Sequence, residues 1–335
     1  MLSARLPSAL DSGLFVLPET GDILVFAPGA DTDLSALPKD RVLIIDDFYP
    51  DCKAWENQGY RVEQDLPEQA AAAVICMPRA KSLARKWVAE ASACVTGPIA
   101  IDGSKTSGIE SILKSCKELT PVSQAFSRAH GKLFTLLPTP ERAAVFAPWH
   151  AGMAEGPDGF ITAPGVFSES KVDKGSAILA AALPDRPGRR IADLGAGWGY
   201  LSARMLKNAD IETVHLIEAS KIALTCAREN ISDERAQFHW GDARKIKLPE
   251  PVDVVITNPP FHVGRAAEPT LGQAFLTNAA ELLTPKGTLW VVANQGLPYE
   301  ATLKELFRIV DQVVLESGFK VLKAMIPNSR SRPKR

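Results

Sequence analysis

The four residues Asn258-Pro259-Pro260-Phe261 have the types and spacing to bind a planar amino group and prepare it for nucleophilic attack. They directly follow the apolar run Val252–Thr257, which is typical of a buried strand. Each proline fixes φ and lacks an N–H, so the turn is stiff and its carbonyl groups remain available as acceptors. The amide oxygen of Asn258 and the carbonyl oxygen of Pro259 could both accept hydrogen bonds from one exocyclic NH2, with Phe261 stacked on the ring that carries it. Hydrogen bonds that pull the N–H bonds out of the ring plane would free the nitrogen lone pair for attack.

A glycine-rich loop upstream places this turn in a wider site. The stretch Arg190–Leu194 predicts a strand that runs into Gly195, Gly197 and Gly199 and then into a helix. Glycines let a ligand approach the backbone closely, and the acidic residue Asp193 stands just before the first of them. A carboxylate would repel the pyrophosphate of a dinucleotide, whereas S-adenosyl-L-methionine has no phosphate and carries a cationic amino group. The loop therefore predicts S-adenosyl-L-methionine as the cofactor, with Asp193 at its methionine end.

Two more acidic residues follow predicted strands. The strand Thr213–Glu218 ends in Glu218, where a ribose diol would lie in a doubly wound nucleotide site. The strand Ala236–Trp240 is followed by Asp242, whose carboxylate could accept a hydrogen bond from the adenine amino group. An acidic residue after a strand is often only a helix N-cap. Because the carboxyl ends of parallel strands meet at one edge of a sheet, however, Glu218, Asp242, Asn258 and the glycine loop together predict a single site.

In this order the motifs resemble the class I S-adenosyl-L-methionine-dependent methyltransferases that modify amino groups. Further matches, over roughly residues 160–326, resemble a narrower family, the bacterial ribosomal RNA guanine-N2 methyltransferases, and its small-subunit enzymes more closely than its large-subunit ones. These matches are Pro164–Ser168, Asp173, Gly175-Ser176, Val292–Asn294 and Leu297–Tyr299. Trp198 departs from the family, because small or polar residues are more usual at that place in the glycine loop.

The resemblance implies a reaction and a set of roles. Asn258, Pro259 and Phe261 would hold the guanine, while Phe167 and Asp173 would help to close the cofactor pocket. The expected activity is transfer of a methyl group to the exocyclic N2 amine of a guanine in ribosomal RNA, in the 16S RNA of the small subunit. The base must be unstacked to reach the methyl group.

These motifs need an α/β fold built from two tandem Rossmann-like methyltransferase domains. A chain of 335 residues suits two domains, which we expect at residues 1–150 and 160–330, divided within the glycine-rich stretch 149–162. The second should be a seven-stranded, mostly parallel sheet. Its last strand should be antiparallel, because Ser317-Gly318 predicts a hairpin between residues 313–316 and 319–326.

The first half shows its own alternation of strands and helices. Apolar runs predict strands at residues 23–26, 42–46, 72–77 and 98–102, and a helix is predicted at residues 80–93. No glycine-rich loop follows any of these strands, since Ala27-Pro28-Gly29-Ala30 contains one glycine beside a proline. This half is therefore predicted to be a degenerate methyltransferase-like domain, as the resemblance also implies, with a role in RNA binding or structural support.

The composition of the chain bears on its RNA contacts, its cysteine chemistry and its cellular location. The net charge of −1 gives no overall basic signature, so RNA contacts are expected from local clusters such as Arg79, Lys81, Arg85 and Lys86. Five scattered cysteines argue against a disulfide framework and against a metal site. The sequence has no long apolar run and no signal-peptide pattern at its start, so a cytoplasmic protein without membrane attachment is expected. Oligomeric state is not predicted.

Several alternatives share part of this pattern. Adenine-N6 methyltransferases and protein glutamine methyltransferases use a similar turn, usually with Tyr where this chain has Phe261. A large-subunit ribosomal RNA guanine-N2 methyltransferase would fit the same motifs. A nicotinamide-dependent oxidoreductase is opposed by the glycine spacing and by Asp193, and a non-enzymatic RNA-binding protein is opposed by the intact motifs. His262 beside the turn could take the substrate proton, although a lone histidine is more often structural.

Overall fold

The computed structural model describes residues 2–260, 262–263, 266–267 and 269–328. The chain divides into two compact units, Met1–Met153 and Ala154–Arg335, and each is described by itself. The division lies within the glycine-rich stretch 149–162. The second part of that stretch is not irregular, because β8 (Ala154–Glu155) and β9 (Ile161–Thr162) form an antiparallel pair. Both the N–H and the C=O of Ile161 are hydrogen-bonded to the side chain of Asn230 in the second unit.

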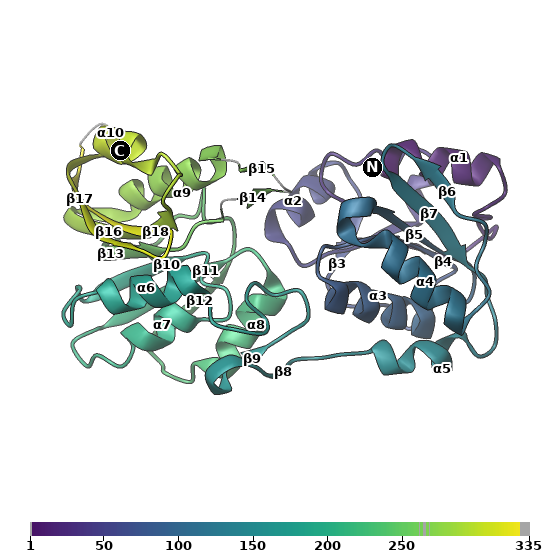
Figure 1. Cartoon of the computed structure of the whole chain (residues 1–335), viewed down its shortest axis with the longest axis horizontal. Helices are drawn as coiled ribbons and strands as arrows, with labels where there is room; N and C mark the ends of the chain where they lie inside the picture. The colour runs from purple at the N-terminus through teal and green to yellow at the C-terminus, as the bar shows by residue number, and fades with distance from the viewer. Residues whose placement is uncertain (1, 261, 264–265, 268, 329–335) are drawn as a thin grey trace. The chain divides into compact units, whose positions relative to one another are not determined.

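A seven-stranded sheet forms the centre of the first unit. Its strands are β1 (Ile23–Phe26), β2 (Val42–Ile45), β3 (Arg61–Glu63), β4 (Ala72–Cys76), β5 (Ile99–Ser104), β6 (Phe126–Arg128) and β7 (Gly131–Leu136). The helices are α1 (Leu6–Asp11), α2 (Tyr49–Asn57), α3 (Lys81–Cys94), α4 (Ile109–Leu119) and α5 (Arg142–Phe146). The strand order is β3-β2-β1-β4-β5-β7-β6, parallel except that β7 is antiparallel to both of its neighbours. Figure 1 labels β3 to β7 of this sheet.

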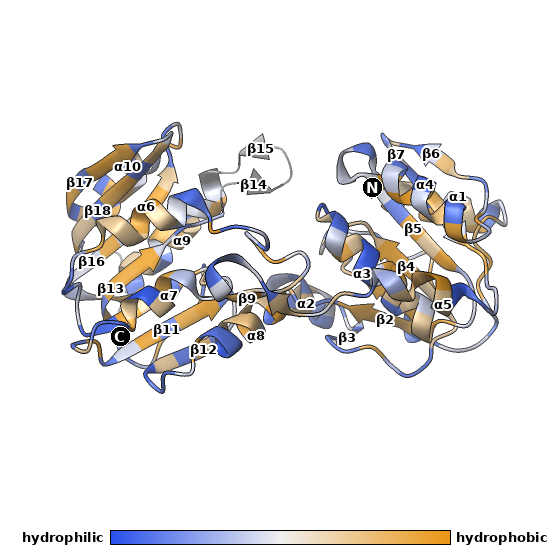
Figure 2. Ribbon diagram, turned by 60° about the horizontal axis from the view of Figure 1, so that its bottom comes forward, coloured by the Kyte–Doolittle hydropathy of each residue, from blue (hydrophilic) through white to orange (hydrophobic). Residues whose placement is uncertain are grey.

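Alternation of side chains along the strands gives this sheet two buried faces. On β1, Leu24 and Phe26 join the core beneath α3 and α4, whereas Ile23 and Val25 join the core on the opposite face with α1 and Trp55 of α2. Apolar residues are concentrated along these central strands (Figure 2). Two covered faces explain why the parallel strands read as continuous apolar runs in the sequence.

The second unit repeats the architecture. Its larger sheet contains β10 (Arg190–Leu194), β11 (Thr213–Glu218), β12 (Ala236–Trp240), β13 (Val252–Thr257), β16 (Leu283–Asn294), β17 (Phe307–Glu316) and β18 (Phe319–Pro327). The helices are α6 (Lys174–Ala182), α7 (Tyr200–Met205), α8 (Lys221–Asn230), α9 (Pro269–Leu282) and α10 (Tyr299–Leu306), and β14 (His262–Val263) pairs with β15 (Ala266–Ala267). Ile191 and Val254 pack on the face covered by α6, α7 and α8, while Leu194 and Val255 pack on the face covered by α9 and α10.

The strand order β12-β11-β10-β13-β16-β18-β17 corresponds position by position to that of the first unit. The predicted tandem Rossmann-like fold is confirmed, including the antiparallel strand β18 between β16 and β17. The predicted hairpin is present at Ser317 and Gly318, which both have positive φ, but β17 begins at Phe307, well before the predicted start. None of the described helices is long and apolar enough to cross a membrane.

Strand β10 lies in the middle of this sheet, with β11 on one side and β13 on the other. The chain runs from β10 to β11 and β12 on one side, and then crosses to β13 on the other side of β10. Ligands bind outside the carboxyl ends of the strands at such a switch point in open α/β sheets. The fold therefore brings the glycine-rich loop after β10 and Asn258 after β13 to the same edge.

Candidate active site

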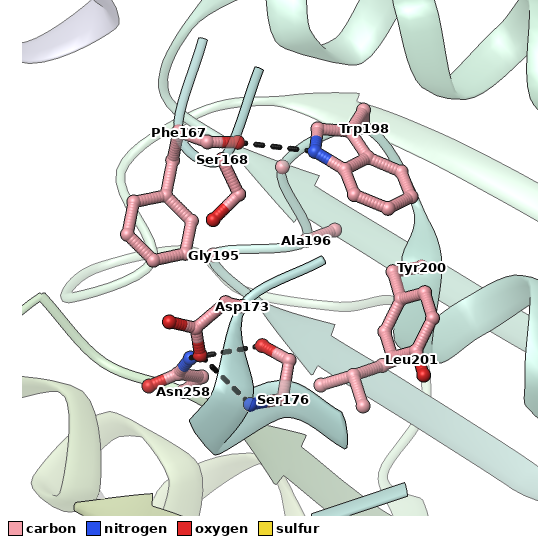
Figure 3. Close-up of a pocket in the computed structure, with 11 residues that line it drawn as sticks. Phe167, Ser168, Asp173, Ser176, Gly195, Ala196, Trp198, Tyr200, Leu201 and Asn258 are labelled. Carbon is pink, nitrogen blue, oxygen red and sulfur yellow. Dashed lines mark hydrogen bonds between the residues drawn. The ribbon is translucent and has the colours of Figure 1, made fainter. Parts of the chain in front are cut away.

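A pocket opens at the carboxyl ends of β10 and β13 (Figure 3). Five of the residues predicted from the sequence line it: Phe167, Asp173, Gly195, Gly197 and Asn258. Six further residues complete the lining: Ser168, Ser176, Ala196, Trp198, Tyr200 and Leu201. Segments that are far apart in the sequence thus meet around one cavity.

The glycine-rich loop needs its glycines for two different reasons. Gly195, Gly197 and Gly199 all have positive φ, which L side chains rarely adopt. A Cβ at Gly197 would meet no protein atom within 4 Å, so it would project into the space of the pocket that this residue lines. A Cβ at Gly199 would instead lie 2.9 Å from a methyl group of Ile231, and this glycine does not line the pocket. Gly197 therefore leaves room for a ligand, and Gly199 lets the loop pack closely against Ile231 and α8.

Glu218 ties this loop to the end of β11. One carboxylate oxygen accepts a 2.8 Å hydrogen bond from the backbone N–H of Gly197, and the other accepts a 2.8 Å bond from the N–H of Ser220. A carboxylate offers about four lone-pair sites and can accept several hydrogen bonds at once. Glu218 is thus fixed beside the loop in an orientation suited to a diol.

Asp193 lies below the loop and is fully buried. One oxygen accepts a 2.7 Å hydrogen bond from the hydroxyl of Ser202, and the other has no hydrogen-bond partner. Burial in this setting raises the pKa of the Asp193 carboxyl to about 7. Asp193 does not line the pocket, but its unpaired oxygen is suited to a cationic partner, since such a partner would offset the cost of burying the charge.

Asp242 already has a partner within the chain. Its two oxygens accept 2.7 Å hydrogen bonds from the guanidinium group of Arg244, and one of them also accepts a 2.9 Å bond from the backbone N–H of the same residue. Asp242 follows β12 as predicted but does not line the pocket. Any ligand contact would have to share its carboxylate with Arg244.

Trp198, the residue that departs from the family pattern, connects the segment that contains Phe167 to the glycine-rich loop by a hydrogen bond. Its indole N–H donates a 3.0 Å hydrogen bond to the carbonyl oxygen of Phe167 (Figure 3). Its ring packs with Phe160 and Val166. The side chain of Phe167 remains 60% exposed at the edge of the pocket. The bulky residue is therefore accommodated by packing beneath the segment that carries Phe167.

Asn258 is held by the start of α6. Its side-chain nitrogen donates a 2.8 Å hydrogen bond to a carboxylate oxygen of Asp173 and a 2.9 Å bond to the hydroxyl of Ser176. The same carboxylate oxygen of Asp173 accepts a bond from the backbone N–H of Ser176 and so caps α6. The amide oxygen of Asn258 points away from both residues (Figure 3). It is left available as an acceptor.

The structure describes only part of the turn that follows β13. Pro259 is buried and Pro260 is exposed, whereas Phe261 lies outside the described residues. The structure describes His262 only as a residue of β14, and its side chain is not described. Among the described residues, no group of three or more His, Cys, Asp or Glu side chains is arranged to hold a metal ion.

Some lining residues were not predicted from the sequence. Tyr200 and Leu201 read as ordinary helix residues after the glycine loop, and Ser168 only ends the family match Pro164–Ser168 without a predicted role of its own. Ser168 nevertheless has a φ of 61° beside the pocket, an uncommon conformation for a residue with a side chain. The bond from the Ser176 backbone N–H to Asp173 could have been anticipated, because Asp is a favoured N-cap residue before an apolar helix.

These features fit S-adenosyl-L-methionine. The open space at Gly197 accepts a ligand near the backbone, the orphaned oxygen of Asp193 suits a cationic amino group, and the fixed carboxylate of Glu218 suits a ribose. The residues that the structure shows lining this pocket include no arginine or lysine that could pair with a phosphate.

Comparisons with known proteins agree with this site. The family described as "Methyltransferase small domain" matches residues 158–323. Ribosomal RNA small subunit methyltransferase C of Hahella chejuensis is 30% identical over 67% of this chain and 67% of its own. Ribosomal RNA large subunit methyltransferase G of Shewanella amazonensis is 32% identical over 48% of this chain and 43% of its own.

The solved structures include one similar protein that spans both units. It is the 16S rRNA N2 G1207 methyltransferase (RsmC) of T. thermophilus, in complex with AdoMet and guanosine. This enzyme is 25% identical and has a TM-score of 0.80, over 96% of this chain and 92% of its own.

Proposed function

Because the chain belongs to the ribosomal RNA guanine-N2 methyltransferase family, we propose that it transfers a methyl group from S-adenosyl-L-methionine to the exocyclic N2 amine of a guanine in small-subunit (16S) ribosomal RNA. The observation that carries this proposal is the Asn258 amide, whose nitrogen is bonded to Asp173 and Ser176 while its oxygen is available beside the glycine-rich loop. An acceptor fixed in this way suits an amine donor.

The cofactor-binding roles follow from the geometry. The loop of Gly195 and Gly197 would hold the methionine end, with the Asp193 carboxylate near the cationic amino group and Glu218 accepting from the ribose hydroxyls. Phe167 would cover the cofactor from the pocket edge. Asp242 would accept from the adenine amino group while it remains bonded to Arg244. When bound, the cofactor supplies a methyl group made electrophilic by its sulfonium.

The reaction is a direct displacement. The N2 lone pair of guanine forms a bond to the methyl carbon as the carbon–sulfur bond breaks, and the electrons of that bond remain on sulfur as a thioether. The side-chain oxygen of Asn258 and the carbonyl oxygen of Pro259 would accept hydrogen bonds from the two N–H groups of the amine. These bonds would hold the nitrogen in line with the methyl carbon and the sulfur, and would draw its lone pair out of conjugation with the ring. The methylated nitrogen then loses its extra proton to these acceptors or to water, so no strong base is needed.

The first unit would contribute RNA binding or structural support without cofactor chemistry. The loop after β1 contains one glycine, and the carbonyl of Pro28 in that loop accepts a 2.9 Å hydrogen bond from the indole N–H of the buried Trp55. In the predicted basic cluster, the Arg85 guanidinium stacks 5.1 Å from the ring centroid of Trp149, and Lys86 forms an ion pair with Glu90. Since Arg85 and Lys86 are engaged in these internal contacts, we assign Arg79 and Lys81 of that cluster to the phosphates of RNA. Ribosomal RNA as the substrate implies action in the cytoplasm.

The decisive experiment supplies methyl-labelled S-adenosyl-L-methionine together with undermethylated small subunits, large subunits and their naked RNAs, and identifies the labelled nucleoside. We expect N2-methylguanosine in small-subunit RNA. Label in large-subunit RNA would move the substrate to that subunit. Label in N6-methyladenosine or in protein, or no label at all, would refute the proposed reaction.

Gly197→Ala should weaken cofactor binding by roughly ten- to hundredfold, because the added methyl group would occupy ligand space. The affinity for S-adenosylhomocysteine, measured by calorimetry, tests this. Gly108→Ala is a matched control, since Gly108 also has positive φ and open space around its Cβ position but lies in the first unit. Both variants should lose about 1 kcal/mol of stability from backbone strain. Equal cofactor affinity in the two variants would contradict the assignment of Gly197.

Asp193 should couple cofactor binding and stability to pH. An unfolded aspartate ionises near pH 4, whereas the folded protein keeps this proton to about pH 7. Between these values the folded state binds more protons, so the free energy of unfolding falls as pH rises, by up to about 1.4 kcal/mol per pH unit. A cationic ligand favours the ionised form, so affinity for S-adenosylhomocysteine should rise between pH 6 and 8, values on the order of this pKa.

Asp193→Asn should remove both the fall in the free energy of unfolding as pH rises and the rise in affinity for S-adenosylhomocysteine between about pH 6 and 8. The matched control is Asp46→Asn in the first unit, because burial also raises the pKa of Asp46 to about 7. In the control, the free energy of unfolding should also depend less on pH, by a similar amount. The affinity of the control for S-adenosylhomocysteine should keep its dependence on pH. If Asp193→Asn leaves that affinity dependence intact, Asp193 is not the partner of the cationic amino group.

A further inference from the structure

We propose that Asp173 and Ser176 are positioning residues, which fix the orientation of the Asn258 amide so that its oxygen, and not its NH2 group, faces the substrate amine. The inference rests on the proposed function and adds two residues that act through Asn258. Asp173 caps α6 and Ser176 lies in its first turn, whereas Asn258 follows β13, so the contact joins separate parts of the sheet edge.

The hydrogen-bonding chemistry allows only one orientation. An asparagine amide has a donor end and an acceptor end of nearly equal size, and a rotation of 180° exchanges them. An ionised carboxylate can only accept hydrogen bonds, so Asp173 selects the NH2 end of Asn258 at 2.8 Å. In the reversed orientation the amide oxygen would face the carboxylate oxygen at this distance. The NH2 group would then point toward the substrate amine, where it could not accept a hydrogen bond.

The carboxylate of Asp173 is itself held firmly. It caps α6 through a 2.8 Å bond from the backbone N–H of Ser176, and the Ser176 hydroxyl provides the second acceptor for Asn258. Between them, Gly175 lets the carboxylate lie close to the chain: a Cβ at Gly175 would be 3.0 Å from the Asp173 oxygen and 3.1 Å from the ring of Phe319. The helix start thus forms a rigid receptor for one end of one amide.

The charge of Asp173 has a further effect on the reaction. A hydrogen bond from the amide NH2 to a carboxylate polarises the amide, so its oxygen becomes a stronger acceptor. This polarisation acts where the N–H bonds of the amine must be drawn out of the ring plane. We therefore expect the contact to change kcat more than KM for the cofactor.

The test exchanges donor and acceptor. Asp173→Asn keeps the helix cap, because asparagine also caps helices well, but it no longer dictates the orientation of Asn258. We expect kcat to fall about tenfold, with a smaller change in KM for S-adenosyl-L-methionine because Asp173 also lines the pocket. Asn258→Asp should lower kcat by about a thousandfold, because two carboxylates then face each other. The double variant Asn258→Asp/Asp173→Asn restores one donor and one acceptor and should regain about tenfold over Asn258→Asp alone.

Controls separate positioning from folding. Ser176→Ala should lower kcat by a few-fold, and Ser176→Thr, which keeps the hydroxyl, should recover it. Asp253→Asn alters a carboxylate that accepts backbone bonds at the start of β10, away from the pocket, and should leave kcat at the wild-type value. Thermal midpoints and binding of S-adenosylhomocysteine establish that each variant is folded.

Two results would overturn the proposal while the wild-type enzyme still makes N2-methylguanosine: an unchanged kcat in Asp173→Asn, or no recovery in the double variant.

If the wild-type protein methylates no RNA, the proposed function fails separately. The positioning is then tested by NMR. The side-chain amide signals of Asn258, assigned by their loss in Asn258→Ala, should shift in Asp173→Asn, and unshifted signals would refute the contact.

Discussion

Replacing Asn258 by alanine is expected to lower kcat by about a thousandfold while affinity for S-adenosylhomocysteine stays within about twofold of wild type. The variant loses the amide oxygen that would accept from the substrate amine, together with the contacts to Asp173 and Ser176. It keeps the glycine-rich loop and Glu218, which would bind the cofactor. Single-turnover methylation of the RNA substrate and calorimetric titration with S-adenosylhomocysteine measure the two quantities independently.

The matched control for this variant is Asn278→Ala. Asn278 is a buried asparagine of the same unit whose side-chain nitrogen donates to the carbonyl oxygens of Ala243 and Ile246. Its replacement should lower thermal stability yet leave kcat close to the wild-type value. Full activity in Asn258→Ala would remove the central claim about the reaction.

Replacing Glu218 by alanine should have the second largest effect, a loss of cofactor affinity of about a hundredfold or more. The variant would lose the ribose acceptor and would release the N–H of Gly197, so the loop would also lose its fixed conformation. We expect KM for S-adenosyl-L-methionine to rise strongly, with a smaller change in kcat at saturation. Equilibrium binding and steady-state kinetics with varied cofactor concentration provide the measurement.

The first unit supplies an internal control for Glu218. Asp46 follows β2, which corresponds to β11 in strand order, and it also accepts a hydrogen bond from the backbone N–H two residues later. Asp46→Ala should therefore disturb a similar strand end without affecting cofactor affinity. A comparable loss of affinity in both variants would show that the effect of Glu218 is structural.

The sequence predicts the central strands well, because burial on both faces demands continuous apolar residues. The predictions at 23–26, 213–218 and 252–257 agree with β1, β11 and β13 to the residue. The edge strands β3 and β17 were harder, although the edge strand β12 agrees with its predicted range. Strand β3 has three residues, of which Arg61 and Glu63 are exposed, and β17 is exposed along most of its length after the buried Phe307. Edge strands lose one neighbour and one buried face, and with them the pattern that reveals a strand.

The site divides in the same way. The glycine-rich loop and the turn at Asn258 were predictable, because their chemistry is local to a few consecutive residues. The bond between Asn258 and Asp173 joins residues 85 positions apart, and the pairing of Asp242 with Arg244 competes with a ligand in a way that spacing alone does not reveal. Contacts of this kind depend on which side chains the folded sheet brings together, so they required the structure.

The repeated strand order also bears on how the chain is made. All seven strands of the first sheet lie before residue 154, so this sheet needs nothing from the rest of the chain to close. At roughly 5–20 residues per second, translation of the remaining residues takes on the order of ten seconds, longer than most single domains need to fold. The first unit can therefore complete its core while the second is still being synthesised. The pocket of the second unit, at the carboxyl ends of β10 and β13, can form only after the strands of that unit have been synthesised.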